Sequence, residues 1–308
     1  MEKILYSSPV WRHPFGLYKL INLAKLYGYN GISVRGSSLD VSEELIGRGI
    51  KAFGYDMLGP SLISQQGIRE LDSLLTDNKL YIHTISVYVP SFLIDNDTSN
   101  SALSLYRKYF ELANKLGAKM IEPVPGSEDV ALKNGLNTDS YIRRITDGYI
   151  ELSRLAKEFG IGVLIEPNEG SPVNRADICK NIIERINRDE VRVALDPVNL
   201  YFEQEDLQKS LDLLVPYTKV IHAKNVKRTK EGDGKYNFKG YGYEYTNIAK
   251  GDIDWSSLIK QVTTLGYNGP IMYEPINPFK LMNREYWEGE MDILELISSF
   301  SKFISKIS

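Results

Sequence analysis

Short apolar runs alternate with longer amphipathic stretches along the whole chain, and this alternation limits the fold more than any other feature. Apolar or β-branched runs of this length are typical of buried strands, and the amphipathic stretches have helical periodicity. The expected strands are 4–7, 31–35, 80–87, 118–122, 161–166, 191–196, 219–222 and 270–274. The clearest expected helices are 15–27, 65–76, 101–116, 139–159 and 287–304. Eight strands linked by crossover helices predict an α/β fold, the (β/α)8 TIM barrel.

The joints between helices and strands repeat along the chain. Gly28, Gly117, Gly160 and Gly266 each stand between an expected helix and the strand that follows it. Glycine readily takes the left-handed conformation that ends many helices, so we expect structural helix caps at these positions. A length of 308 residues suits one barrel. We therefore expect a single domain over residues 1–308.

Composition and charge restrict the partners. The chain is 43% hydrophobic and 25% charged, which is ordinary for a soluble globular protein. A net charge of -3 offers no general attraction to nucleic acid, and neither a signal peptide nor a membrane-spanning run is recognisable. We expect a cytoplasmic protein with no nucleic-acid or membrane partner. The single cysteine, Cys179, is expected to be a buried thiol without a role.

Four expected strands end in an acidic residue or a histidine. These residues are Glu166, Asp196, His222 and Glu274. In a parallel barrel the carboxyl ends of the strands meet at one mouth, where barrel enzymes place their chemistry. Three carboxylates and one imidazole suit one divalent cation, Mn2+, Mg2+, Co2+ or Zn2+. The alternative is that each acid caps a helix or pairs with a Lys or Arg at the rim.

Several segments around these residues resemble a known family. They are VLIEPN at 163–168, LDPVN at 195–199, IHAKN at 221–225, GDIDW at 251–255 and GYNG at 266–269. They are similar to the sugar phosphate isomerase/epimerase family of xylose isomerase-like TIM barrels, which includes ketose 3-epimerases, hydroxypyruvate isomerases and inosose dehydratases. The resemblance implies metal ligation by Glu166, Asp196, His222 and Glu274, with the two glutamates also transferring protons. It further implies a substrate contact by Arg228, six residues after the histidine.

The chain also departs from the family pattern at three positions. Many relatives carry Asp where this chain has Asn225, Glu in the second strand where it has Ser33, and His where it has Asn199. The amide of Asn199 can still hold a sugar hydroxyl. The two missing acids leave the particular activity open.

Other residues near the expected mouth are candidates for contact with a substrate. Glu122 ends a strand, Lys224 follows His222 on the same side of an extended strand, and Trp11 and His13 follow the first strand. Each has a structural alternative: a rim ion pair for Glu122, ligand orientation for Lys224 and plain packing for the other two. The Gly- and Tyr-rich segment 229–250 is expected to be a long loop that closes over a polyol or, alternatively, a surface excursion.

This set of residues favours proton transfer next to a carbonyl, through an enediolate that a cation stabilises. Epimerisation needs a base on one face of the carbon and an acid on the other, a task that suits Glu166 and Glu274 if they come from separated strands. The leading hypothesis is a metal-dependent isomerase or epimerase of a small-molecule sugar or sugar phosphate, in carbohydrate metabolism. An inosose dehydratase-type lyase and a non-catalytic sugar- or metal-binding barrel are the alternatives. Homo-oligomer formation stays open.

Overall fold

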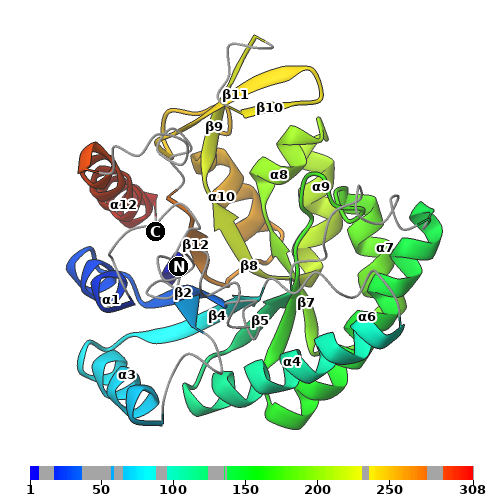
Figure 1. Cartoon of the computed structure of the whole chain (residues 1–308). Helices are drawn as coiled ribbons and strands as arrows, with labels where there is room; N and C mark the ends of the chain where they lie inside the picture. Colours follow the sequence, from blue (N-terminus) through cyan, green and yellow to red (C-terminus); the bar gives the residue numbers. More distant parts are fainter. Residues whose placement is uncertain are drawn as a thin grey trace.

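The computed structural model describes residues 1–6, 17–36, 57–58, 65–87, 96–123, 135, 137–230, 236–275 and 287–307. Eight parallel strands of its main sheet form a closed barrel (Figure 1). They are β1 (Lys3–Tyr6), β2 (Gly31–Gly36), β4 (Tyr81–Val87), β5 (Met120–Pro123), β6 (Gly162–Ile165), β7 (Val191–Leu195), β8 (Thr218–Ala223) and β12 (Ile271–Tyr273). β1 pairs with both β12 and β2, which closes the barrel. A ninth strand, β3 (Met57–Leu58), pairs with the end of β2.

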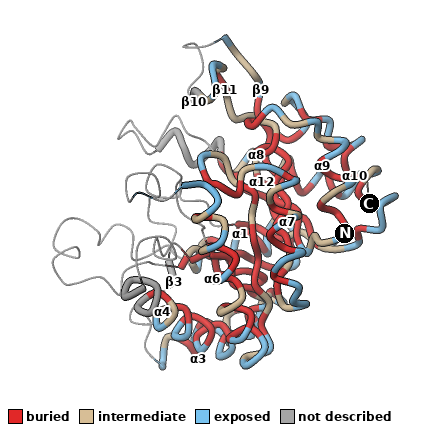
Figure 2. Tube along the Cα trace, turned by 90° about the vertical axis from the view of Figure 1, so that its right-hand side faces the viewer, coloured by how far each residue is buried: buried red, intermediate tan, exposed pale blue. Residues whose placement is uncertain are grey.

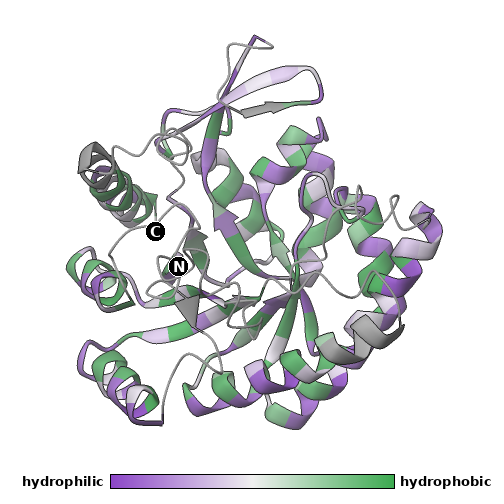
Figure 3. Ribbon diagram, viewed as in Figure 1, coloured by the Kyte–Doolittle hydropathy of each residue, from purple (hydrophilic) through white to green (hydrophobic). Residues whose placement is uncertain are grey.

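Helices surround the barrel and confirm the predicted (β/α)8 fold (Figure 1). They are α1 (Leu17–Leu26), α3 (Gln65–Asp77), α4 (Asn96–Lys115), α6 (Thr138–Phe159), α7 (Ala176–Ile186), α8 (Pro197–Phe202), α9 (Leu207–Leu214), α10 (Trp255–Thr264) and α12 (Trp287–Ile307), with a short 3-10 turn at Val215–Tyr217. Their apolar and polar residues lie on different sides (Figure 3). In α6, for example, Tyr149, Leu152 and Ala156 are buried, because apolar residues at helical spacing form one stripe.

The core has two layers, and both follow from strand geometry. Alternate residues of a strand point to opposite faces, so Ile4 and Tyr6 belong to a small inner cluster with Leu164 and Val220. Leu5, between them, belongs to the large cluster that the helices cover. Buried residues accordingly form a continuous interior (Figure 2).

The predicted glycine caps are confirmed by the backbone. Gly28, Gly117, Gly160 and Gly266 have φ angles of 67°, 63°, 66° and 91°, and each lies one or two residues after the end of a helix. Only glycine adopts this left-handed region without steric cost, so these residues let each helix stop and the chain turn into the next strand.

The segment 229–250 is not the long loop expected from its composition. β9 (Asn225–Thr229), β10 (Tyr236–Phe238) and β11 (Tyr241–Thr246) form a small antiparallel sheet beside the barrel (Figure 1). Tyrosines alternate along β11, and Lys239 and Gly240 both have positive φ angles, 49° and 80°. Two such residues make the tight turn that two-residue hairpins prefer.

Three further expectations concern single residues and segments. Cys179 is buried in α7, as predicted. Within the described ranges, every helix is too short or too polar to cross a bilayer. Trp11 and His13 lie outside the described residues.

Candidate metal centre

Five acidic or imidazole side chains come together at the carboxyl-terminal mouth of the barrel. Glu122 lies in β5 and His222 in β8, while Glu166, Asp196 and Glu274 directly follow β6, β7 and β12. The backbone N–H of Glu274 donates to the carbonyl of Ala223 at 2.9 Å, which extends the pairing of β12 with β8 past its last residue. Parallel strand ends therefore place the four predicted ligands at one mouth.

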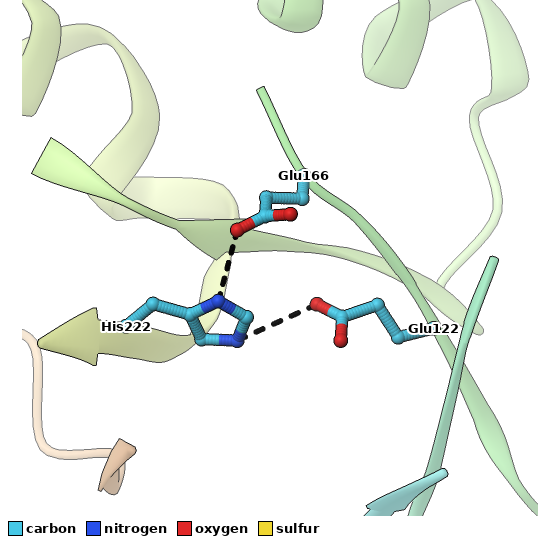
Figure 4. Close-up of side chains that lie close together, drawn as sticks. All are labelled: Glu122, Glu166 and His222. Carbon is cyan, nitrogen blue, oxygen red and sulfur yellow. Dashed lines mark hydrogen bonds and ion pairs between the residues drawn. The ribbon is translucent and has the colours of Figure 1, made fainter. Parts of the chain in front are cut away.

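His222 lies at the centre of the cluster and is only 1% exposed. Its Nδ1 atom is 2.9 Å from Oε1 of Glu166 and 3.9 Å from Oε1 of Glu274. Its other nitrogen, Nε2, is 3.4 Å from Oε1 of Glu122, so the ring lies between two carboxylates (Figure 4).

Asp196 is held by backbone and side-chain groups at once. Its Oδ1 atom accepts hydrogen bonds from the N–H groups of Val198 at 2.8 Å and Asn199 at 3.2 Å, which caps α8. Its Oδ2 atom is 2.6 Å from Nζ of Lys224, and the same ammonium donates to Oε2 of Glu274 at 2.9 Å. The alternative reading of a helix cap paired with a lysine thus also describes Asp196.

Amide and hydroxyl groups orient Glu122 in β5 and Glu166, which follows β6. Asn199 Nδ2 donates to Glu166 Oε1 at 3.3 Å, and Asn168 Nδ2 donates to Glu166 Oε2 at 3.2 Å. The hydroxyl of Ser86 in β4 donates to Oε2 of Glu122. The roles of Asn168 and Ser86 were not predicted. Asn168 lies two residues after Glu166 in the family-like segment, but no local signal marks Ser86.

Burial and neighbouring charges change the pKa values of these groups. Burial alone lowers the pKa of His222, but the carboxylates of Glu122 and Glu166 more than offset it and raise that pKa to about 10. Burial also lowers the pKa of Lys224, and the surrounding carboxylates raise it well above its ordinary value. Burial raises the pKa of Glu122 to about 7 and that of Asp196 to about 6. Without a cation, a protonated ring and an ammonium therefore neutralise part of the carboxylate charge.

The donor set fits a divalent cation. In each of two groups, Glu122 with Glu166 and His222, and Asp196 with His222 and Glu274, the potential ligand atoms lie within 4.8 Å of one another. Buried carboxylates and imidazoles are normally paired or bound to metal. Oε1 of Glu122 and Nε2 of His222 are buried without a hydrogen-bond partner among the described residues. Oxygen-rich sets with one nitrogen suit Mg2+ or Mn2+ and admit Zn2+.

The remaining predicted contacts fall into two groups. Asn199, Lys224 and Glu122 lie within the cluster, as the contacts above show. The guanidinium of Arg228 in β9 instead lies over the rings of Tyr201 and Tyr241, at 4.8 and 4.3 Å from their centres. Substrate contact by Arg228 stays a prediction; its guanidinium lies against aromatic rings, and its backbone N–H donates to Asp252 Oδ2 at 2.6 Å.

A closed (β/α)8 barrel with carboxylates and a histidine at its carboxyl-terminal mouth defines a class of barrel enzyme sites. The chain belongs to the family of xylose isomerase-like TIM barrels, whose family model matches residues 21–297. Inosose dehydratase of Clostridium perfringens is 22% identical over 178 residues, which are 53% of this chain and 60% of that protein. The chain thus matches less than two thirds of the length of this relative.

Solved structures share the fold over nearly their full length. The IolI protein with a bound zinc atom has a TM-score of 0.72 and 16% identity, covering 100% of this chain and 98% of that one. D-psicose 3-epimerase from Clostridium cellulolyticum H10, solved with D-tagatose, has a TM-score of 0.72 and 16% identity, covering 99% and 98%. At these identities, the likeness establishes the barrel architecture.

Proposed function

We propose that this protein is a divalent-metal-dependent isomerase or epimerase that acts on a sugar or sugar phosphate by proton transfer. The observation that carries the proposal is that carboxylate oxygens of Glu166 and Glu274 lie 2.9 and 3.9 Å from one imidazole nitrogen, Nδ1 of His222. Glu166 follows β6 and Glu274 follows β12, and β7 and β8 separate these strands in the barrel. The two carboxylates therefore approach Nδ1 of His222 from different parts of the mouth.

The roles of the four residues follow from their contacts. Glu166, Asp196, His222 and Glu274 would hold the cation. The potential ligand atoms of Asp196, His222 and Glu274 lie within 4.8 Å of one another, and Glu166 meets the same limit in a second group with His222 and Glu122. When bound, a divalent cation polarises the substrate carbonyl and offsets the negative charge that develops on oxygen. Burial raises the pKa of Glu166, but the charges of His222 and Lys224 more than offset it and lower that pKa. Glu166 is therefore a carboxylate near neutral pH and able to accept a proton, and Glu274 is placed to return one.

The substrate would be a small polyhydroxylated carbonyl compound. Asn199, Lys224 and Glu122 offer polar atoms at the mouth, and we retain Arg228, His13 and Trp11 as further candidates for contact. The names of the solved relatives support a sugar as substrate, since one of them was crystallised with D-tagatose. We also propose a single barrel domain over residues 1–308, a cytoplasmic location and a capacity for homo-oligomer formation.

A lyase is the second candidate, because a curated relative of this chain is an inosose dehydratase. Proton removal next to a carbonyl is common to both reactions, and dehydration then expels a hydroxyl instead of returning a proton to carbon. Product analysis separates the two: an unsaturated or diketo product identifies the lyase, and an epimer or an aldose–ketose pair identifies the isomerase.

The test is hydrogen exchange at the reacting carbon. The full chain is loaded in turn with Mn2+, Mg2+, Co2+ and Zn2+, and ketoses and their phosphates are followed in deuterated water. We expect exchange with the active substrate and its loss in Glu166→Gln and in Glu274→Gln, each of which removes one proton acceptor. Glu190→Gln, which makes the same change at the opposite mouth, serves as the control. Exchange retained in both glutamate variants would contradict the proposal.

A further inference from the structure

Lys224 is a buried cation inside the predicted ligand set. Its side chain is only 8% exposed, and it joins two of the proposed ligands, Asp196 and Glu274. The distances are 2.6 Å to Asp196 Oδ2 and 2.9 Å to Glu274 Oε2. The contact with Glu274 is a charge-assisted hydrogen bond, and the contact with Asp196 is a close ion pair.

Asp196 has a single carboxylate oxygen left for a cation. Its Oδ1 atom accepts from two backbone N–H groups at the start of α8. Rotating the carboxylate to present Oδ1 would remove that cap, so Oδ2 is the oxygen that a metal has to use. Oδ2 is also the atom that Lys224 contacts.

A metal ion and the ammonium would be close neighbours on this oxygen. Metal–oxygen distances are about 2.0–2.2 Å. With Nζ at 2.6 Å from Oδ2, the two positive centres would lie less than about 5 Å apart. Their repulsion is strong at this distance because little water screens a buried pair.

We propose that Lys224 is a built-in competitor of the metal ion. In the metal-free protein its ammonium bridges Asp196 and Glu274, which holds the two carboxylates together despite their like charge. Metal binding displaces the ammonium from Oδ2 of Asp196. Lys224 thus keeps the empty site assembled and at the same time weakens its affinity for the ion. This inference rests on the proposed metal site but not on the reaction.

The test is metal affinity, measured directly. Full-length protein is stripped with a chelator and titrated with Mn2+ by calorimetry. We expect Lys224→Met to bind Mn2+ at least about tenfold more tightly than the natural protein, because one nearby positive charge is gone. Lys219→Met is the matched control, since Lys219 is exposed near the start of β8 and Lys224 directly follows the end of the same strand. Its affinity should equal that of the natural protein.

The sign of the change decides between two roles. If Lys224 served only to orient the ligands, its removal would weaken binding about 10- to 100-fold, as loss of an outer partner does. Weaker or unchanged binding in Lys224→Met would therefore overturn the inference while leaving the metal site intact. If neither the natural protein nor the variant binds Mn2+, the proposed function fails as well. Binding of Mn2+ by Lys224→Met but not by the natural protein would support complete competition between the Lys224 ammonium and the metal ion.

Thermal unfolding supplies a second measurement. Without metal, Lys224→Met should unfold at a lower temperature than the natural protein, because Asp196 and Glu274 lose their shared counter-charge. Saturating Mn2+ should restore most of the lost unfolding temperature. The rise in unfolding temperature on adding Mn2+ should therefore be larger in the variant than in the natural protein. If Lys224→Met does not fold, Lys224→Gln also removes the charge while keeping a polar end. An equal rise in unfolding temperature on adding Mn2+ to the variant and to the natural protein would contradict the inference.

Discussion

The two ring nitrogens of His222 contact different carboxylates. Nδ1 faces Glu166 and Glu274, whereas Nε2 faces Glu122 at 3.4 Å. A histidine that binds metal through one nitrogen normally donates the N–H of the other to a carboxylate or carbonyl. Glu122 occupies that outer position, and Ser86 in turn holds Glu122. This geometry suits Glu122 to orienting the ring, in addition to the substrate contact predicted for it.

Replacing Glu122 by Gln should weaken metal binding. The substitution keeps the size of the side chain but removes the charge that faces Nε2 of His222. We expect affinity for Mn2+ to fall about 10- to 100-fold, as measured by calorimetry. Glu190→Gln at the other mouth should leave the affinity unchanged. An unaltered affinity in Glu122→Gln would show that the ring is oriented without it.

Metal affinity should rise with pH. The pKa of His222 in the metal-free protein is about 10, so at pH 8 its ring is protonated and both nitrogens carry hydrogen. Metal and proton compete for the same nitrogen, and raising the pH therefore favours the metal. We expect roughly a tenfold gain per pH unit between about pH 7 and 9. Calorimetry in buffers of different ionisation heat should show that one proton is released for each ion bound. Binding without proton release would contradict a protonated His222 ring in the metal-free protein.

At the scale of elements, the junction between β8 and β9 explains a departure from the family pattern. Asn225 is buried, and its Nδ2 donates to the carbonyls of Ile248 at 2.8 Å and Ile253 at 2.9 Å. Its Oδ1 accepts from the N–H groups of Val226 and Ile253. Gly251 packs so closely against this amide that a Cβ there would overlap it. An aspartate has no donor for the two carbonyls, so Asn225 ties the small sheet to the start of α10.

Asn225→Asp should therefore be destabilising. Two buried carbonyls would lose their donor, and a charge would be buried in their place. We expect the free energy of unfolding to fall by at least about 2 kcal/mol in urea titrations. Asn247→Asp keeps the acceptor that Asn247 offers to Ala249, so its effect should stay within about 0.5 kcal/mol. Equal stability of Asn225→Asp and the natural protein would refute the structural role of the amide.

At the scale of the molecule, the two mouths of the barrel differ. The carboxyl-terminal mouth gathers the carboxylates and His222. A cavity of about 900 Å3 lies at the other mouth, lined by residues that include His83, Lys119, Arg192 and Lys219. None of the predicted site residues lines it. The proposed site therefore rests on the direction of the strands and not on the volume of this cavity.

Metal binding should stabilise the whole barrel. An ion that binds only the folded state at 100 times its dissociation constant adds about 2.7 kcal/mol to the free energy of unfolding. We expect that gain for the natural protein in urea titrations with Mn2+, and its loss after addition of a chelator. His222→Ala, which lacks the imidazole that we propose as a ligand, should gain much less. An equal gain in this variant would place the ion elsewhere.

The sequence by itself determined the barrel strands, the helix caps and the acidic residues and histidine at four strand ends, because each depends on periodicity or on residues next to one another in the chain. The hairpin at Lys239 and Gly240 escaped prediction because its turn depends on backbone angles that composition does not reveal. Only the tertiary structure decided which side chains meet. Ser86 reaches Glu122 and Lys224 reaches Asp196 because β4 lies beside β5 and β7 beside β8. Contacts between residues far apart in the sequence depend on barrel closure and side-chain packing. A local sequence pattern predicts neither of these.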